Sequence, residues 1–232
     1  MNTINVFKLF GVNEKALSSF LEKSGVLFTI TKNTNDYLLK LDFSSLDDSK
    51  IDEIIKEFLA KFGKFTYAES DVSLKEQLVK ILTLRGEKVS TAESFTGGGV
   101  AHEITSVSGA SKVFYEGVVA YSPDSKHLRL GVSYQTLDTF KPVSSQVACE
   151  MVKGLLEVSD TDFAISTTGI AGPNSDSSDF EVGLCYIGIG SKSKITVFKH
   201  KFKGNRQEII KNGIDIALFH AIMALRSGNY DV

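Results

Sequence analysis

Two kinds of apolar spacing alternate along the first 70 residues. Half-buried strands alternate apolar and polar residues. This pattern occurs at residues 4–10, 26–31 and 37–43, and more briefly at residues 65–68. Apolar residues three and four positions apart predict helices over residues 14–23 and 46–62. Together these elements predict a small, compact α+β module over residues 1–70.

Strands and helices alternate through the rest of the chain. The predicted strands cover residues 87–91, 116–121, 162–168, 182–190 and 194–202. The predicted helices cover residues 74–85, 97–106, 145–156 and 206–226. Such alternation indicates a sheet with helices on both faces, although the last two strands have no helix between them. We therefore predict a three-layer α/β/α sandwich with a mixed sheet over residues 73–228, with Ser73 as the N-cap of its first helix.

Composition excludes several classes of function. The 232 residues carry a net charge of −2, which gives no overall attraction to nucleic acid or to an anionic membrane. The four histidines and two cysteines show no paired spacing typical of a zinc site. No signal-peptide pattern is visible, and no apolar run approaches the roughly 18 residues of a membrane helix. We expect a cytoplasmic protein with no membrane segment and no bound metal.

The segment Thr91–Gly99 combines a strand end, a polar turn and a glycine-rich helix start. The first N–H groups of a helix lack partners inside the helix and attract negative charge. Ser94 or Thr96 is therefore a candidate nucleophile beside an oxyanion site. The competing interpretation is an ordinary helix cap followed by a flexible first turn.

The segment Tyr121–Lys126 also follows a predicted strand, and Pro123 suits the first position of a helix. This places Lys126 one turn into that helix. A desolvated lysine loses its proton more readily and can serve as the base of a Ser–Lys pair. The competing interpretation is a solvated surface lysine, and His127 is an alternative base.

Two further segments suit a polar or phosphate group. Thr168 and Gly169 begin a glycine-containing loop after the strand 162–168, although an ordinary strand-ending turn would show the same residues. Arg206 stands at the start of the last helix, where a guanidinium and helix N–H groups can bind phosphate. The lysines of residues 192–203 are separated from Arg206, because charged residues commonly protect an exposed edge strand.

Five segments then occur in a fixed order: Ala92–Gly98, Tyr121–Lys126, Thr168–Pro173, Val182–Gly183 and Gly204–Arg206. In order and spacing they resemble the C-terminal domain of CinA-type (competence/damage-inducible) proteins, the nicotinamide-nucleotide amidases. The resemblance extends from Ser73 to Gly228. Residues 3–70 resemble the KH-like module that precedes this domain in longer CinA proteins, most clearly at Lys8–Glu14. This module lacks the Gly-x-x-Gly loop with which KH domains bind nucleic acid, so nucleic-acid binding is not expected.

The resemblance implies hydrolysis of nicotinamide mononucleotide to nicotinic acid mononucleotide and ammonia, without metal or cofactor. Ser94 would attack the carboxamide carbon, Lys126 would accept the serine proton, and Tyr121 would orient one of them. The implied oxyanion and substrate-binding residues are Thr96, Gly97, Gly98, Thr168, Gly169 and Arg206.

The chain departs from the family pattern in three places. Phe95 replaces a usual cysteine, and residues 123–125 replace Asn-Glu-x before the lysine. Asp176, Asp179 and Glu181 make the following loop acidic, which is unfavourable near an anionic substrate. The alternative function is therefore a catalytically weak nucleotide-binding or regulatory protein on the same fold. The sequence does not fix the oligomeric state, and we expect a homodimer or a higher homo-oligomer.

Overall fold

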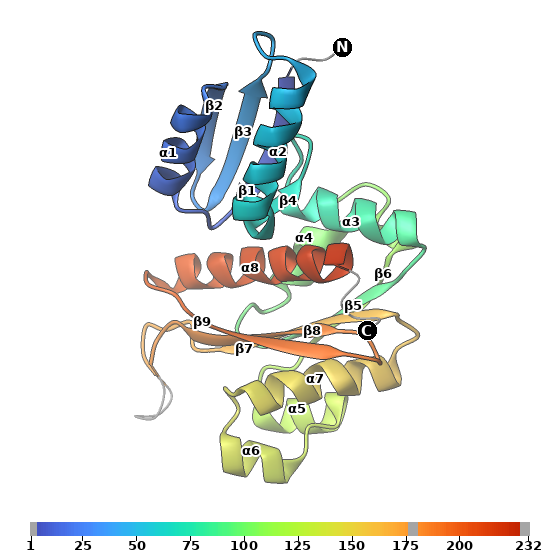
Figure 1. Ribbon diagram of the computed structural model, residues 1–232. Coiled ribbons are helices and arrows are strands. Elements are labelled where there is room, and N and C mark those ends of the chain that lie inside the picture. Colours follow the sequence, from blue (N-terminus) through green and yellow to red (C-terminus); the bar gives the residue numbers. More distant parts are fainter. Residues whose placement is uncertain (1–3, 176–180, 228–232) are drawn as a thin grey trace. The chain divides into compact units, whose positions relative to one another are not determined.

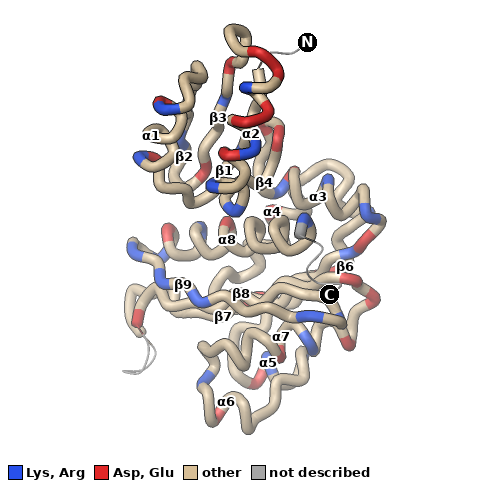
Figure 2. Tube along the Cα trace, viewed as in Figure 1, with Lys and Arg blue, Asp and Glu red and all other residues tan. Residues whose placement is uncertain are grey.

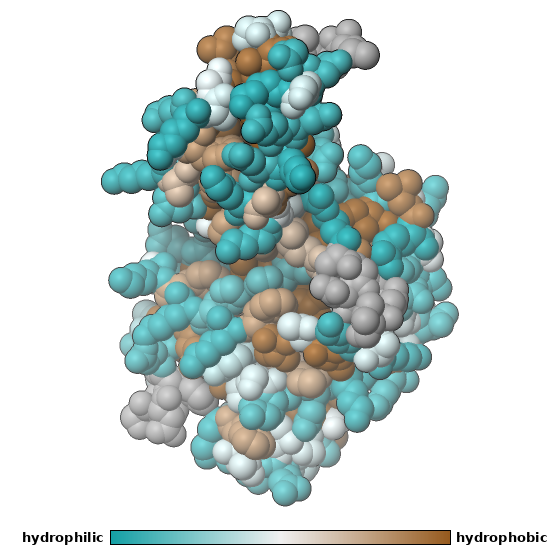
Figure 3. Space-filling model, viewed as in Figure 1, coloured by the Kyte–Doolittle hydropathy of each residue, from teal (hydrophilic) through white to brown (hydrophobic). Residues whose placement is uncertain are grey.

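The computed structural model describes residues 4–175 and 181–227 (Figure 1). Contacts between residues divide the chain into two compact units, Met1–Ser73 and Leu74–Val232. None of the helices in the described ranges is both long enough and apolar enough to cross a membrane. In Figure 3, hydrophilic side chains cover most of the visible face of each unit.

The first unit is a four-stranded antiparallel sheet with both helices on one face. Its elements are β1 (Ile4–Phe10), α1 (Glu14–Ser24), β2 (Leu27–Asn33), β3 (Asp36–Asp42), α2 (Asp48–Phe62), the 3-10 turn Gly63–Phe65 and β4 (Thr66–Ala68). The strand order is β2-β3-β1-β4. The predicted α+β order is confirmed, and α2 begins two residues later than predicted because the Asp47 side chain caps it by accepting from the Lys50 amide.

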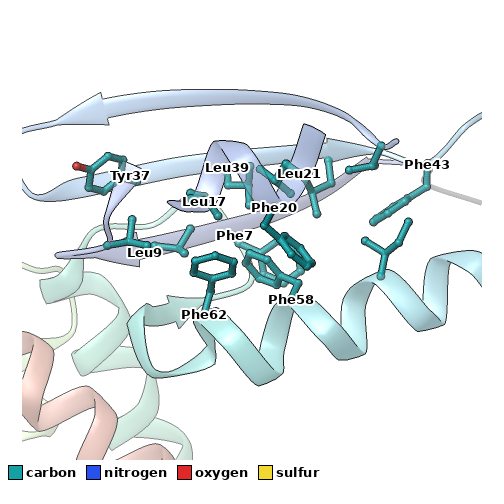
Figure 4. Packing of buried hydrophobic residues seen from close by; sticks show 14 residues of the cluster. Phe7, Leu9, Leu17, Phe20, Leu21, Tyr37, Leu39, Phe43, Phe58 and Phe62 are labelled. Carbon is teal, nitrogen blue, oxygen red and sulfur yellow. The ribbon is translucent and has the colours of Figure 1, made fainter. Parts of the chain in front are cut away.

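An aromatic cluster fills the space between this sheet and its helices (Figure 4). Phe7 of β1 lies 4.8 Å from Phe58 of α2, measured between ring centroids, and Phe20 of α1 lies 5.5 Å from Phe62 of α2. Aromatic side chains bury large areas, which lets a module of this small size hold a core of its own.

The second unit is a three-layer α/β/α sandwich, as predicted. Its elements are α3 (Leu74–Arg85), β5 (Val89–Glu93), α4 (Gly99–Thr105), the 3-10 turn Ala110–Lys112, β6 (Phe114–Val119), α5 (Pro123–Leu130), α6 (Tyr134–Phe140), α7 (Ser145–Val158), β7 (Phe163–Gly169), β8 (Leu184–Gly190), β9 (Ile195–Lys201) and α8 (Arg206–Ser227). The sheet is mixed, with order β6-β5-β7-β8-β9. β5 runs parallel to β6 and β7, whereas β8 is antiparallel to both β7 and β9. Helices α3, α4 and α8 cover one face, and α5, α6 and α7 cover the other (Figure 1).

The lysines of residues 192–203 lie on and beside β9 (Figure 2). β9 is an edge strand of the sheet, so these charges protect an open edge from pairing with another chain. Their position on an edge strand agrees with the interpretation that set them apart from Arg206.

Several predicted bounds need correction: the strand predicted at 116–121 is β6, which runs from Phe114 to Val119, and the strand predicted at 182–190 is β8, which begins at Leu184. The strand predicted at 87–91 is β5, which runs from Val89 to Glu93, so it extends two residues closer to Ser94. The strand continues through Glu93 because this residue pairs with Val119 of β6 and with Thr167 of β7, and its buried carboxylate is hydrogen-bonded within the protein. The pattern also missed α6, a helix of 7 residues, which is too short to show an apolar stripe and is identifiable only by its Ser133 cap.

Candidate active site

The candidate site lies where two parallel strands end. Ser94 directly follows β5, and Thr168 and Gly169 end the neighbouring strand β7. The Ser94 amide donates to the Thr167 carbonyl at 3.0 Å, so the two strand ends are tied together. Ligand sites in open α/β sheets commonly occupy this edge.

A pocket of about 410 Å³ opens beside these strand ends. This volume is within the range of small-molecule sites. Its lining consists of Ser94, Phe95, Tyr121, Pro123, Lys126, Lys141, Pro142, Val143, Thr168, Gly169, Ile170, Ala171, Gly172, Asn174 and Arg206. Among the described residues of this lining there are three cations and no carboxylate, so the pocket favours an anionic ligand.

Ser94 and Lys126 are in direct contact inside the pocket. The Lys126 ammonium nitrogen lies 2.9 Å from Ser94 Oγ, and the two residues are 2% and 7% exposed. Lys126 sits in the first turn of α5, which the Ser122 side chain caps by accepting from the Ser125 amide. The structure therefore contradicts the solvated-lysine interpretation.

Burial changes the protonation of Lys126. Desolvation lowers its pKa from 10.5 to about 8, because the uncharged amine loses less on leaving water than the ammonium does. Among the described residues, Lys126 has no carboxylate partner that would restore the charged form. At neutral pH a fraction of Lys126 is therefore available as a base next to the Ser94 hydroxyl.

Glu93 organises the turn that follows the strand. Its buried carboxylate accepts from the backbone amides of Gly98, Val100 and Ala101 at 2.8 to 3.0 Å, and from the Thr96 hydroxyl at 2.7 Å. An anion at this position also balances the positive end of the α4 dipole. Glu93 thus fixes the turn on which Ser94 stands, a role that sequence reasoning missed although an acidic residue before a helix start is its usual sign.

We expect Glu93→Gln to lower the free energy of unfolding by about 1 to 3 kcal/mol. All four partners of the carboxylate donate hydrogen bonds to it. The NH₂ group of a glutamine side chain is also a donor, so it could not accept any of these hydrogen bonds. Denaturant titration of wild type and variant measures the loss, with the exposed Glu157→Gln on α7 as the matched control. Equal stability of the two variants would show that the Glu93 contacts contribute nothing.

The oxyanion donors predicted from the glycines require a correction. The Gly97 amide donates to the Ser94 carbonyl at 3.0 Å, and the Gly98 amide donates to Glu93, so neither is free. Both glycines have positive φ, 62° and 92°, and their function is to close the turn. The Thr96 hydroxyl is also occupied, by Glu93 and by Thr167 Oγ1 at 2.6 Å, which argues against Thr96 as nucleophile.

The remaining donors of this turn are the amides of Phe95 and Thr96. A turn closed from Gly97 to Ser94 uses neither N–H group of its two central residues. Within the described part of the chain, these two amides have no hydrogen-bond partner. They are adjacent to Ser94, and successive free amides form an anion-binding concavity.

Tyr121 and Arg206 form a second hydrogen-bonded unit in the pocket lining. The guanidinium donates to the Tyr121 hydroxyl at 3.0 Å and to the Gly172 carbonyl at 2.7 Å. This corrects the expectation that Tyr121 orients Ser94 or Lys126, because its hydroxyl is held by Arg206. Arg206 has no carboxylate partner among the described residues, so its charge is available to a ligand.

Thr168 and Gly169 line the pocket as predicted, and both are fixed by neighbours. The Thr168 hydroxyl donates to the Pro142 carbonyl at 2.7 Å, so it shapes the wall. A side chain at Gly169 would collide with Cys185 of β8. His127, the alternative base, stacks on Tyr134 with ring centroids 3.9 Å apart and is not part of the lining.

Of the three acidic residues in the loop before β8, only Glu181 lies within the described residues. Glu181 forms an ion pair with Lys201 at the end of β9. Asp176 and Asp179 lie outside the described residues. Within the described ranges, no cluster of three or more His, Cys, Asp or Glu side chains could hold a metal ion.

Comparisons with known proteins show which family this chain is similar to. Residues 71–225 match the family model described as the CinA C-terminal domain. A CinA-like protein of Kosmotoga olearia is 38% identical over 87% of this chain and 47% of its own length. A CinA-like protein of Fusobacterium nucleatum is 34% identical over 93% of this chain and 54% of its own length. The chain thus spans about half the length of these curated relatives.

Comparison with solved structures also finds competence/damage-inducible proteins. The competence/damage-inducible protein CihA from Agrobacterium tumefaciens matches with a TM-score of 0.63 and 36% identity, over 66% of this chain and 93% of that one. A CinA superfamily protein from Klebsiella pneumoniae matches with a TM-score of 0.65 and 26% identity, over 66% of this chain and 96% of that one. The chain therefore belongs to the CinA family.

Proposed function

We propose that this protein hydrolyses the carboxamide of nicotinamide mononucleotide to nicotinic acid mononucleotide and ammonia. The observation that carries the proposal is the 2.9 Å contact between Ser94 and a buried Lys126 whose pKa falls to about 8. A serine hydroxyl needs an adjacent base to become a nucleophile, and this pair supplies one without a histidine.

The first half-reaction forms an acyl-enzyme. Ser94 Oγ attacks the carboxamide carbon while the neutral Lys126 amine takes the hydroxyl proton. The amides of Phe95 and Thr96 donate to the oxygen that becomes negative. Lys126 then returns its proton to the departing nitrogen, the carbon–nitrogen bond breaks, and ammonia leaves an ester on Ser94.

The second half-reaction releases the acid. Lys126, neutral again, removes a proton from a water molecule that attacks the ester carbon. The tetrahedral intermediate collapses, Ser94 Oγ regains a proton from Lys126, and the carboxylic acid product leaves. Each proton taken from a nucleophile is thus given to a leaving group, and no oxidant, metal or cofactor takes part in this scheme.

The rest of the pocket supports a phosphorylated substrate. Arg206 is held in place by Tyr121 and Gly172 and still carries a charge without a carboxylate partner in the described residues. A guanidinium suits the planar geometry of two phosphate oxygens. The pocket therefore provides a reactive serine at one part of its wall and an anion site at another.

Purified protein is expected to release ammonia from nicotinamide mononucleotide, with one equivalent of nicotinic acid mononucleotide formed. Coupled ammonia detection and chromatographic identification of the acid measure both products, with Ser94→Ala as the background. If wild type releases no ammonia above this background, the amidase proposal fails. Binding of the nucleotide without turnover would then favour the catalytically weak, nucleotide-binding alternative.

A further inference from the structure

Lys141 has a backbone conformation that side chains rarely adopt. Its φ is 67° and its ψ is 161°, a region occupied almost only by glycine. The other non-glycine residue with positive φ in the described ranges is Thr34, which lies in the hairpin turn between β2 and β3. Lys141 instead follows α6 and belongs to the same pocket lining as Arg206.

Neighbouring contacts hold Lys141 in this conformation. The Ser144 hydroxyl donates to the Lys141 carbonyl at 3.0 Å, and the same side chain caps α7. The next residue, Pro142, favours an extended ψ at Lys141 and accepts from Thr168 at the end of β7. The segment is therefore fixed between a helix start and a strand end, so the backbone cannot relax around residue 141.

The charge of Lys141 is available to a ligand. The side chain is exposed and belongs to the pocket lining. Its ammonium has no hydrogen-bond or ion-pair partner within residues 4–175 and 181–227. A residue that is strained, charged and unpaired at a ligand pocket is a candidate for a role in binding. No hydrogen bond or ion pair of the Lys141 side chain within the described residues offsets the cost of its backbone conformation.

Charge balance indicates what Lys141 binds. A phosphate monoester carries about two negative charges near neutral pH. Arg206 supplies one positive charge for the phosphate, and Lys126 is assigned to proton transfer at Ser94, whose Oγ lies 2.9 Å from its nitrogen. Lys141 is the third cation of the described lining, so it is the group that completes the match.

We propose that Lys141 is a specificity-determining residue that binds the phosphate of the substrate together with Arg206. It selects phosphorylated pyridine nucleosides over their dephosphorylated forms. This inference rests on the proposed function for the identity of the substrate, but its binding component does not require turnover.

The test compares two product-like ligands that differ only in the phosphate. Titration calorimetry measures the dissociation constants of nicotinic acid mononucleotide and of nicotinic acid riboside for wild type and for Lys141→Met. We expect the methionine variant to bind the mononucleotide about 10-fold or more weakly, since a charge-assisted hydrogen bond is lost, and to bind the riboside unchanged. Lys141→Arg retains the charge and is expected to stay within about 3-fold of wild type.

Two further variants separate charge from strain and from general effects. Lys141→Gly removes the charge but relieves the backbone, so it should match the methionine variant in binding while raising the melting temperature by about 2 to 4 °C. Lys112→Met removes an exposed charge that does not belong to the pocket lining and should leave both dissociation constants unchanged.

The outcomes distinguish this proposal from the proposed function. An unchanged ratio of the two dissociation constants in Lys141→Met, or equal weakening of both ligands, overturns the role of Lys141 even if ammonia is released. A changed ratio in a protein that releases no ammonia overturns the amidase activity and supports the phosphate site. Failure of wild type to prefer the mononucleotide over the riboside also overturns the role of Lys141.

Discussion

Replacing Ser94 with alanine is expected to lower the rate of ammonia release from nicotinamide mononucleotide by about 10⁴-fold or more. No other group can attack in its place. The Thr96 hydroxyl is bound to Glu93 and Thr167, and no cysteine belongs to the pocket lining. The residual rate would come from the oxyanion donors and from binding of the substrate.

The Ser94 prediction separates chemistry from folding. The alanine variant should bind nicotinic acid mononucleotide as wild type does, because the contacts assigned to the phosphate are unaffected. Ser111→Ala, at an exposed position, is the matched control and should retain full activity. A Ser94→Ala variant that kept a rate within 10-fold of wild type would exclude serine as the nucleophile.

The architecture could be predicted because its signals are local. Apolar alternation and helical spacing depend on neighbouring residues, so most elements of both units and the two-sided covering of the second sheet were correctly predicted. Boundaries were less accurate wherever a side-chain cap decided them. Asp47 delays the start of α2, and Ser133 begins a helix that has no apolar stripe of its own.

The candidate site was only partly predictable, because its details depend on contacts between distant segments. The sequence identifies Ser94, Lys126 and Arg206 as reactive or charged residues after strands or at helix starts. It does not show that Arg206 holds Tyr121, since 85 positions separate them. Nor does it show how amide hydrogens are shared, because the Gly98 amide is bound by a carboxylate that precedes Ser94.

Lys141 illustrates a further limit of sequence reasoning. In the sequence, nothing distinguishes Lys141 from any other exposed lysine after a short helix. Its importance arises from a φ of 67° and from the pocket that it lines, and both depend on how Pro142 and Ser144 are fixed by other elements. Backbone strain at a functional position is visible only once the surrounding contacts are known.

Replacing Lys126 with methionine is expected to reduce turnover by about 10³-fold or more, comparable to other losses of a general base acting on serine. Methionine fills a similar volume but cannot accept the Ser94 proton. Ligand binding should persist, since Lys126 is assigned to proton transfer and not to the phosphate. Unchanged turnover in this variant would assign the base to another group.

The pH profile of wild type tests the same role without a mutation. Lys126 accepts a proton only when neutral, so kcat/KM should rise about tenfold per pH unit below the pKa of about 8 and level off above it. Burial also raises the neutral fraction at pH 7 by about 300-fold relative to a lysine with a pKa of 10.5. A profile that stays flat from pH 6 to pH 9 would contradict a lysine base.

The stability of Lys126→Met should change in the opposite direction to its activity. The pKa of Lys126 is lower in the folded protein than in the unfolded chain, so the unfolded chain binds its proton more tightly. Keeping this lysine buried therefore costs stability at neutral pH. That cost is fully present below pH 8, declines as the pH rises, and vanishes above about pH 10.5.

From the two pKa values the cost is about 3 kcal/mol at pH 7, and methionine avoids it. Denaturant titration of both proteins at pH 7 and pH 10 should therefore show an advantage for the variant that shrinks at the higher pH, whereas Lys112→Met should show no such change. Lost packing in the variant would lower its stability equally at both pH values, so a difference in stability that did not change between pH 7 and pH 10 would contradict the lowered pKa of Lys126.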